Sequence, residues 1–236
     1  MLPLRDANPT RRTPYVTISL IALCVAVFLL ELQVSGGPGG DVALERLFAS
    51  WGAVPSRISA ALAGSGDPWL ALRGVIGSLF LHAGWSHLLG NMLFLWIFGN
   101  NVEDRLGRLA YLGFYIAGGT LAALAQVVID PTSDVPLVGA SGAIAATLGA
   151  YIVLYPRARI TSLVFLGILA QLIDVPAVVV LGFWFALQLL DGVASLGATT
   201  AQGGVAFFAH IGGFLAGALV GVLIRAVRPH GGRPGG

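Results

Sequence analysis

Charged residues are scarce in this sequence. Only 10% of its 236 residues carry charge, whereas 56% are hydrophobic, and the mean hydropathy is +0.86. A soluble domain carries roughly a quarter charged residues, so this composition excludes an ordinary water-soluble protein and indicates one that lies in a bilayer. The net charge of only +2 provides no basic surface for nucleic acid, so nucleic acid is not expected as a partner. The single cysteine, Cys24, excludes an intramolecular disulfide.

Long apolar runs, in contrast, are abundant. A hydrocarbon core about 30 Å thick is crossed by roughly 20 apolar residues in a helix, and several runs approach that length. The six runs are residues 15–32, 85–101, 109–129, 138–155, 175–192 and 205–226. Asp174 and Pro176 look like the N-cap and first-turn proline of the fifth run. The sequence therefore predicts an all-α polytopic membrane protein with a bundle of six transmembrane helices.

The segments outside these runs complete the predicted domain organisation. Residues 1–14 are expected to form a cytoplasmic N-terminal tail, residues 15–226 the membrane domain, and residues 227–236 a disordered cytoplasmic tail rich in Gly and Pro. Residues 33–84 have apolar side chains at mixed helical spacing among scattered charges, which favours a long first loop in the membrane interface. Residues 160–173 are interpreted as a short interfacial or re-entrant piece.

The arginines predict the orientation in the membrane. With six spans, both termini share one side, and that side holds ten of the thirteen arginines: Arg5, Arg11, Arg12, Arg105, Arg108, Arg157, Arg159, Arg225, Arg228 and Arg233. The other side holds Arg46, Arg57 and Arg73. Because cytoplasmic loops carry the excess of positive charge, both termini are expected to be cytoplasmic. The protein is thus expected to be a multi-pass membrane protein.

A small set of polar residues lies in or beside the apolar runs. They are His82, His87, Asn91, Ser141, Gln188 and His210. Polar groups inside a bilayer are costly and are functional candidates by default. The second, fourth and sixth spans all run inward from the outer face. At about 1.5 Å rise per residue, the histidines, Asn91 and Ser141 would therefore lie within about 10–15 Å of that face, where water can enter. No buried Asp or Glu is expected beside the histidines.

Stripes of small residues predict that two of these spans touch. Each stripe lies on one helix face: Ser141, Ala145 and Gly149 on the fourth span, and His210, Gly213, Gly217 and Gly221 on the sixth. Small residues at this spacing let helix backbones approach closely. If the stripes face each other, the Ser141 hydroxyl meets the His210 imidazole, which is the minimal unit of nucleophilic acyl transfer.

His87 and Asn91 lie four residues apart and so share a helix face. Both side chains can donate hydrogen bonds to a developing oxyanion. The stretch "GASG" around Ser141 gives flexible backbone whose amide groups can join them. The sequence therefore offers a nucleophile, a base and oxyanion donors at one depth.

Three blocks resemble the signature blocks of the rhomboid intramembrane serine proteases. They are "HAGWSHLLGN" at residues 82–91, "GASGA" at 139–143 and "AHIGGFLAG" at 209–217. The stretch "NNVEDRLGRLAYLGFYIAGG", with Glu103 and Gly107, also resembles the segment after the second helix of that family. The resemblance covers about residues 75–226, with the blocks in the order of the family.

The resemblance implies a six-helix core and a Ser–His dyad, with Ser141 as nucleophile and His210 as general base. His87, Asn91 and the Ser141 backbone N–H would form the oxyanion hole. Supporting positions would be His82, Gly139 and Gly142, and the fifth span with Trp184 and Phe185 would be a lateral gate. The implied substrates are membrane proteins with a transmembrane segment, cleaved near the outer face within the lipid bilayer and without a cofactor.

The sequence departs from the family pattern at two places, and the first keeps open a second interpretation, in which the protein is not catalytic. Ala145 stands where the family often has an aromatic residue on which the catalytic histidine stacks, so the orientation of His210 has to come from elsewhere. In the first loop, "LRG" at residues 72–74 replaces the usual Trp-Arg pair, and Arg73 can substitute one position early. The rival is a non-catalytic rhomboid-like protein that binds transmembrane helices, although such relatives typically lose the serine or the histidine.

Two further classes of protein are not favoured. His82 and His87 are five residues apart and do not share a helix face, and no carboxylate or thiolate completes a set, so a metal site is not expected. A transporter would show repeated halves, broken helices or charged pathway residues, and these are not evident in the sequence.

Overall fold

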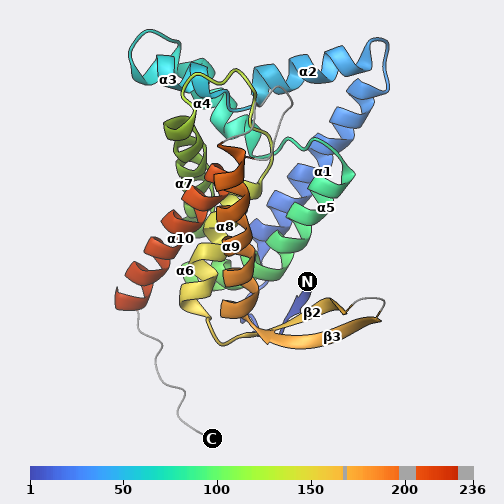
Figure 1. Cartoon of the computed structure of the whole chain (residues 1–236), viewed down its shortest axis with the longest axis vertical. Helices are drawn as coiled ribbons and strands as arrows, with labels where there is room; N and C mark the ends of the chain where they lie inside the picture. The colour runs from blue at the N-terminus through green and yellow to red at the C-terminus, as the bar shows by residue number, and fades with distance from the viewer. Residues whose placement is uncertain (167–168, 197–205, 228–236) are drawn as a thin grey trace, which may run out of the picture.

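The computed structural model describes residues 1–166, 169–196 and 206–227. Most of the described chain is helical, and the long helices stand side by side in an elongated bundle (Figure 1). The helices are α1 (Tyr15–Ser35), α2 (Gly40–Trp51), α3 (Pro55–Leu62), α4 (Pro68–Ser78), α5 (Trp85–Phe94), the π-helix η1 (Leu95–Gly99), α6 (Asn100–Leu106), α7 (Arg108–Ile129), α8 (Ser141–Leu154), α9 (Ala177–Ser195) and α10 (Phe207–Val227).

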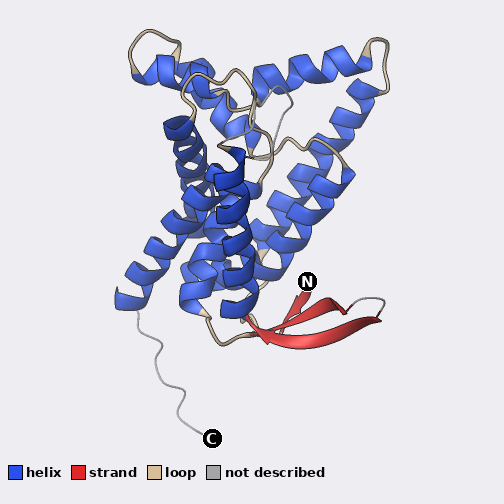
Figure 2. Ribbon diagram, viewed as in Figure 1, coloured by secondary structure: helices blue, strands red, loops and turns tan. Residues whose placement is uncertain are grey.

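A small sheet covers the end of the bundle where the N-terminus lies (Figure 2). Its three antiparallel strands, in the order β1-β2-β3, are β1 (Leu2–Asp6), β2 (Arg159–Leu166) and β3 (Leu169–Pro176). In β2 the alternate side chains of Ile160 and Ser162 are buried, as the period of a strand requires. The all-α prediction is therefore wrong at this end.

The start of α9 differs from the expectation for the same reason. Asp174 lies in β3 and accepts a hydrogen bond from Thr161 Oγ1 at 2.7 Å across the hairpin, so it does not cap the helix. Pro176 ends the strand, and α9 begins at Ala177. Residues 160–166 and 169–173 thus lie in two paired antiparallel strands, and hydrogen bonds between the strands satisfy their backbone N–H and C=O groups.

The core of the bundle is α8. Every residue from Gly142 to Tyr151 in this helix is buried, which is the state expected of a helix that is apolar all round. Fourteen residues make a helix of about 21 Å, shorter than a hydrocarbon core of about 30 Å. Because the neighbouring helices surround α8, its length does not have to match the lipid.

Four helices in the described chain are long and apolar enough to cross a membrane: α1, α7, α9 and α10. The helix α8 is apolar but shorter, and the run expected at 85–101 is divided into α5, η1 and α6. The ends of the five helices that match the other runs lie within a few residues of the expected limits. The count of six spans stays a prediction.

Glycines bring α8 and α10 into backbone contact. A Cβ atom at Gly217 would collide with the carbonyl of Ala146, one at Gly213 with the carbonyl of Gly142, and one at Gly149 with the carbonyl of Phe214. The expected stripe on α10 therefore faces α8. On α8 the contact is centred one residue further along than expected, on Ala146 and not on Ala145.

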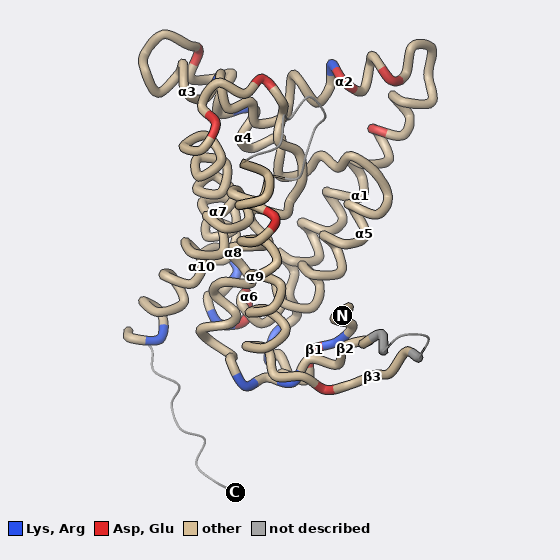
Figure 3. The backbone as a smooth tube through the Cα atoms, in the orientation of Figure 1, with Lys and Arg blue, Asp and Glu red and all other residues tan. Residues whose placement is uncertain are grey.

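The first loop folds into α2, α3 and α4 at the end of the bundle opposite the sheet (Figure 1). Arg73 secures this loop, since its Nη2 donates to the Ser50 carbonyl at 2.9 Å and its guanidinium lies 5.0 Å from the centre of the Trp51 ring. Figure 3 places most charged positions near the two ends of the bundle. The interfacial location of the loop stays a prediction.

Candidate active site

Ser141 is the first residue of α8, and the loop before it is fixed by backbone hydrogen bonds. Leu137 N–H donates to the Ala53 carbonyl at 2.8 Å, and Gly139 N–H donates to the Ser78 carbonyl at 2.9 Å. The first N–H groups of a helix have no partner within it, so the backbone around Ser141 presents donors at this point. The serine thus lies at the amino end of a buried, rigid helix.

Gly139 has two reasons to be glycine. Its φ of +124° lies in the region that side chains rarely adopt. A Cβ atom there would also approach the Cε1 and Nε2 atoms of His87 to 2.6 Å. Gly142, the other supporting glycine, packs against α7, because its Cβ would meet the Cβ of Ala122 at 2.7 Å. Gly139 therefore permits the His87 ring to lie beside the Ser141 loop.

The structure brings Ser141 and His210 together from separate helices. The Nε2 atom of His210, in the first turn of α10, lies 2.8 Å from the Oγ atom of Ser141. The opposite ring nitrogen, Nδ1, lies 2.6 Å from Oε1 of Gln188 on α9. The hydroxyl–imidazole contact that the small-residue stripes predicted is therefore present, and a third polar side chain extends it.

These residues line a cavity of about 830 Å³. Its polar side chains include Ser86, His87, Asn91, Ser141, Gln188 and His210, and its apolar ones include Phe94, Leu148, Trp184 and Phe207. Five of the six polar candidates that the sequence indicated thus face one space. His82 lies behind it, in contact with the lining residue His87.

Asn91 supplies a free donor to the cavity that Ser141 also lines. Its side chain is only 8% exposed, and among the described residues its Nδ2 has no hydrogen-bond partner. Leaving a buried donor unpaired costs about 1–3 kcal/mol. An amide that faces a cavity in this condition is suited to bind an oxygen that becomes negatively charged during a reaction.

His82 is held behind the cavity by a buried carboxylate. The side chain of His82 is 1% exposed, and its backbone N–H donates to Glu31 Oε1 at 3.0 Å. Its Nδ1 lies 3.1 Å from the Phe80 carbonyl and must carry the proton, because a carbonyl only accepts. The ring packs edge-on against His87 at 5.3 Å between centroids. His82 therefore supports the ring that lines the cavity.

Glu31 corrects the expectation that no acidic residue is buried with the histidines. It lies near the end of α1 and is only 2% exposed. In the sequence it stands within the first apolar run, so a carboxylate inside a span was the available signal. Its partner, the backbone of a loop fifty-one residues later, follows from the tertiary fold and not from the local pattern.

Two aromatic residues of α9 lie next to the dyad. The Trp184 ring lies 6.1 Å from the His210 ring and 6.0 Å from the Phe214 ring, and Phe185 stacks on Phe214 at 4.4 Å. The fully buried Ala145 offers no ring to His210. The aromatic neighbour of the histidine therefore comes from α9 and not from α8.

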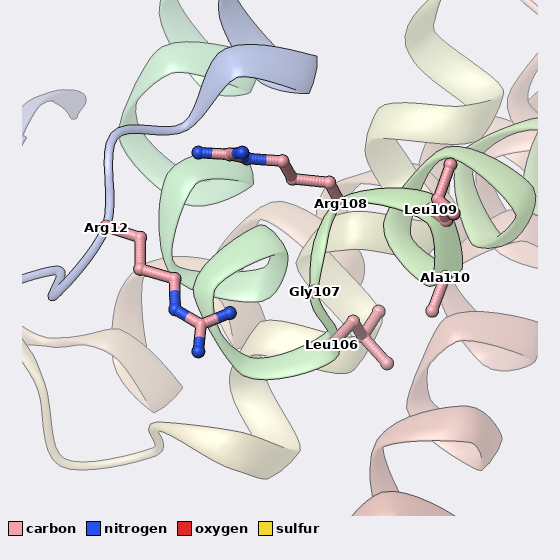
Figure 4. Close-up of a pocket in the computed structure, with 6 residues that line it drawn as sticks. All are labelled: Arg12, Leu106, Gly107, Arg108, Leu109 and Ala110. Carbon is pink, nitrogen blue, oxygen red and sulfur yellow. The ribbon is translucent and has the colours of Figure 1, made fainter.

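A second cavity lies near α6 and the start of α7, lined by Arg12, Leu106, Gly107, Arg108, Leu109 and Ala110. Figure 4 shows that the guanidinium groups of Arg12 and Arg108 do not converge on one point, and the Arg108 guanidinium lies 4.5 Å from the centre of the Tyr15 ring. Neither a nucleophile nor a base lines this cavity. No group of three His, Cys, Asp or Glu side chains in the described ranges is placed to hold a metal ion.

Comparison with known proteins finds relatives over most of the chain. The model of the Rhomboid domain matches residues 70–227. The chain is 32% identical over 211 residues to the rhomboid protease GluP of Bacillus subtilis, a match that covers 89% of this chain and 35% of that protein. It is 32% identical over 151 residues to the mitochondrial rhomboid protein 1 of Saccharomyces cerevisiae, covering 62% and 40% of the two chains.

A third relative is the rhomboid protease GlpG of Yersinia pestis, with 28% identity over 133 residues, or 56% of this chain and 41% of that protein. The chain thus aligns with less than half of the length of each of these relatives. The matched domain includes Ser141, His210 and every cavity-lining residue. With four helices able to cross a membrane and most of its length matched by the domain, this chain belongs to the rhomboid family.

Proposed function

We propose that this protein is a serine endopeptidase that cleaves transmembrane segments of membrane proteins near the outer face of the bilayer. The observation that carries the proposal is the 2.8 Å separation of Ser141 Oγ and His210 Nε2 in a cavity with polar walls. Two of the relatives given above are named as rhomboid proteases. Membrane proteins with a transmembrane segment are therefore the proposed substrates.

The proposed reaction is acyl transfer through Ser141. His210 Nε2 takes the proton of the Ser141 hydroxyl as Oγ attacks the scissile carbonyl carbon. The same imidazolium gives that proton to the leaving amine when the peptide C–N bond breaks. A water molecule, deprotonated by Nε2, then attacks the acyl carbon. The bond between that carbon and Ser141 Oγ breaks as Nε2 returns the proton to Oγ, which releases the second product as a carboxylic acid and restores the dyad. His210 thus carries every proton transfer in these steps.

The oxyanion that forms during each attack needs donors on one side of the carbonyl. The proposed donors are the free Asn91 amide, the His87 ring and the backbone N–H of Ser141. Such preorganised donors stabilise the transition state more than the substrate, because the charge exists only in the former. Removing one donor typically lowers kcat by a factor of about 10²–10³.

The proposed setting is a bacterial inner membrane, with six spans and both termini in the cytoplasm. Tails at residues 1–14 and 227–236 flank the membrane domain at residues 15–226; residues 228–236 lie outside the described part. The excess of arginine on the side of the termini supports this orientation. Ser141 is the first residue of α8, and the opposite end of this helix leads into strand β2 of the sheet, so the dyad is proposed to face outward.

The central test is labelling with a fluorophosphonate probe together with cleavage of a single-span substrate in liposomes. Both signals should disappear in Ser141→Ala and in His210→Ala, and both should persist in the control Ser35→Ala, whose hydroxyl at the end of α1 only bonds the Leu32 carbonyl. Mass spectrometry of the products locates the cut. A folded wild type that neither labels nor cleaves would identify the protein as a non-catalytic binder of transmembrane helices.

We further propose α9 as the lateral gate for the substrate. The stacked contact between Phe185 and Phe214 is one of three ring contacts between α9 and α10, and it does not include His210. Phe185→Ala should therefore raise the rate of cleavage, since it loosens this contact without touching the dyad. Unchanged or lower turnover in the folded variant argues against the gate.

A further inference from the structure

His210 has two ring nitrogens, and each has a side-chain partner. Nε2 lies 2.8 Å from Ser141 Oγ, and Nδ1 lies 2.6 Å from Gln188 Oε1. An amide oxygen accepts hydrogen bonds and cannot donate them, so the ring nitrogen that faces it carries the proton. A neutral imidazole has one protonated nitrogen. With the proton on Nδ1, the lone pair of Nε2 points at the serine.

This tautomer is the one that a general base requires. If the amide nitrogen of Gln188 faced the ring instead, Nδ1 would have to accept and Nε2 would carry the proton toward Ser141. The histidine would then be unable to take the serine proton. The choice between a competent and an incompetent base therefore depends on which end of one amide group faces the ring.

The side chains placed to orient the His210 ring come from α9. The position on α8 from which an aromatic ring could hold the imidazole is Ala145, a side chain of one carbon. The two side chains on α9 that approach His210 are Trp184 and Gln188. They are four residues apart, so they lie on the same face of α9. One contacts the ring and the other binds its outer nitrogen.

We propose that Gln188 is a positioning residue for His210: its amide oxygen holds the imidazole in the Nδ1–H tautomer and aims Nε2 at Ser141. The inference rests on the proposed function in that Ser141 is the group to be deprotonated. It adds to the dyad a third member that plays the orienting role of the buried carboxylate in a serine-protease triad. Because Gln188 is neutral, it sets the geometry without adding a charge to the site.

The location of Gln188 links the base to the position of α9. Only Ala177, Val180, Leu181 and Gly192 are buried in this helix, so the turns near Gln188 are held by few interior contacts. Separation of the turn that carries Gln188 from α10 breaks the contact between the amide and His210. The catalytic base is therefore fully oriented only while this turn lies against His210, a contact in which Phe185 takes no part.

The first test compares variants of position 188. Gln188→Leu keeps the approximate size but removes the acceptor, and should lower kcat on the order of 10- to 100-fold, with KM changed by less than about twofold, because the lost contact acts on the chemical step. Gln188→Glu restores an oxygen acceptor and should recover most of the activity. The matched control is Leu187→Ala, an exposed neighbour on the same helix. If the wild type is active and Gln188→Leu has the same kcat, the inference about Gln188 is overturned while the proposed function stands.

The second test reads the tautomer directly and needs no catalysis. In protein labelled with ¹⁵N-histidine, measured where the imidazole is neutral, the ring shifts identify the protonated nitrogen, and the spectrum of His210→Ala assigns the signals. The wild type should show His210 with Nδ1 protonated, and Gln188→Leu should show a mixture of both tautomers, while Leu187→Ala matches the wild type. A wild type protonated on Nε2, or an unchanged Gln188→Leu spectrum, overturns the inference.

The two tests also separate the inference from the proposed function. A wild type with the Nδ1–H tautomer, and a mixed Gln188→Leu spectrum, but without probe labelling or cleavage leaves the orienting role intact and rejects the protease. If Gln188→Leu does not fold, Gln188→Met provides the same loss of an amide oxygen with a more flexible side chain, and thermal melting identifies which variant is folded.

Discussion

At the scale of single residues, the site depends as much on absent side chains as on reactive ones. Gly139 adopts a φ of +124°, and its missing Cβ leaves the space that the His87 ring fills. Asn91 leaves a donor unpaired. Because Ala145 has no ring, the aromatic contact of His210 comes from Trp184 on α9. Of these features, the unpaired Asn91 donor costs about 1–3 kcal/mol of stability. The cavity therefore keeps a free donor at a cost in stability.

Gly139→Ala should damage the site through both backbone and ring. The Cβ would meet the His87 ring at 2.6 Å, and alanine is disfavoured at this φ, so we expect a loss of stability on the order of 1–3 kcal/mol and a large fall in kcat. The matched control is Gly113→Ala in α7, where a Cβ has open space. Thermal melting and substrate cleavage measure both effects. Wild-type activity in Gly139→Ala would contradict the close approach of His87 to this loop.

At the scale of secondary-structure elements, contact between α8 and α10 joins the two halves of the dyad. Their backbones touch along Gly142, Ala146 and Gly149 on one side and Gly213 and Gly217 on the other. Close packing of this kind depends on small residues. A hydroxyl and an imidazole on different helices stay within 3 Å only if the helices cannot move apart.

Gly217→Val should separate the helices and disable the dyad without touching either reactive group. A side chain at Gly217 collides with the backbone of Ala146, which cannot yield as a flexible side chain would. We expect fluorophosphonate labelling of Ser141 to fall at least about tenfold, since an ångström of misplacement is enough to cost about 10²-fold. Gly182→Ala in α9, where a Cβ meets nothing within 4 Å, is the control. Labelling at the wild-type rate in Gly217→Val would show that the contact is not needed.

The sequence was informative where each element could be recognised by itself. Apolar runs located the long helices, and polar residues at one depth, with spacing of small residues, indicated that Ser141 and His210 meet. The strands at residues 159–166 and 169–176 were not predicted, because a short apolar run is consistent with either a strand or a buried helix. The pairing of β2 with β1 is not visible locally. Glu31 and Gln188 were recognisable as polar, but their partners lie on other elements and depend on the tertiary fold.

At the scale of the whole molecule, the N-terminal strand is joined to the core helix. Asp6 Oδ2 accepts hydrogen bonds from Tyr151 on α8 and from Asn101 on α6, both at 2.6 Å. The Asn8 side chain extends this cluster to Asn101 Oδ1 at 2.8 Å. The expected tail at residues 1–14 thus includes a strand and a polar anchor. The sheet and the active site are attached to opposite ends of α8.

The Asp6 anchor should weaken as pH rises. Burial raises the pKa of the Asp6 carboxyl, although hydrogen bonds from Tyr151 and Asn8 act in the opposite direction. A raised pKa in the folded state means that the folded protein favours the protonated acid. The resulting stability is present below the ordinary pKa of about 3.9 and is lost as the pH passes the raised value.

The difference in melting temperature between wild type and Asp6→Asn isolates this effect, because other groups titrate equally in both proteins. Relative to the variant, the wild type should become less stable between acidic and neutral pH. A constant difference, or one that grows in favour of the wild type, contradicts the raised pKa. Asp41→Asn, on α2 at the other end of the bundle, is the control.

The register of the small sheet also constrains the order of assembly. Leu2 of β1 pairs with Leu163 of β2. Strand β1 therefore cannot pair until β2 has been synthesised, which happens after α1 to α8. Contacts between distant parts of a chain form late, because a long loop has to be closed first. β1 therefore stays unpaired while α1 to α8 are being made. The sheet can close, and bind the Tyr151 end of α8 through Asp6, only once the helix that begins with Ser141 has been completed.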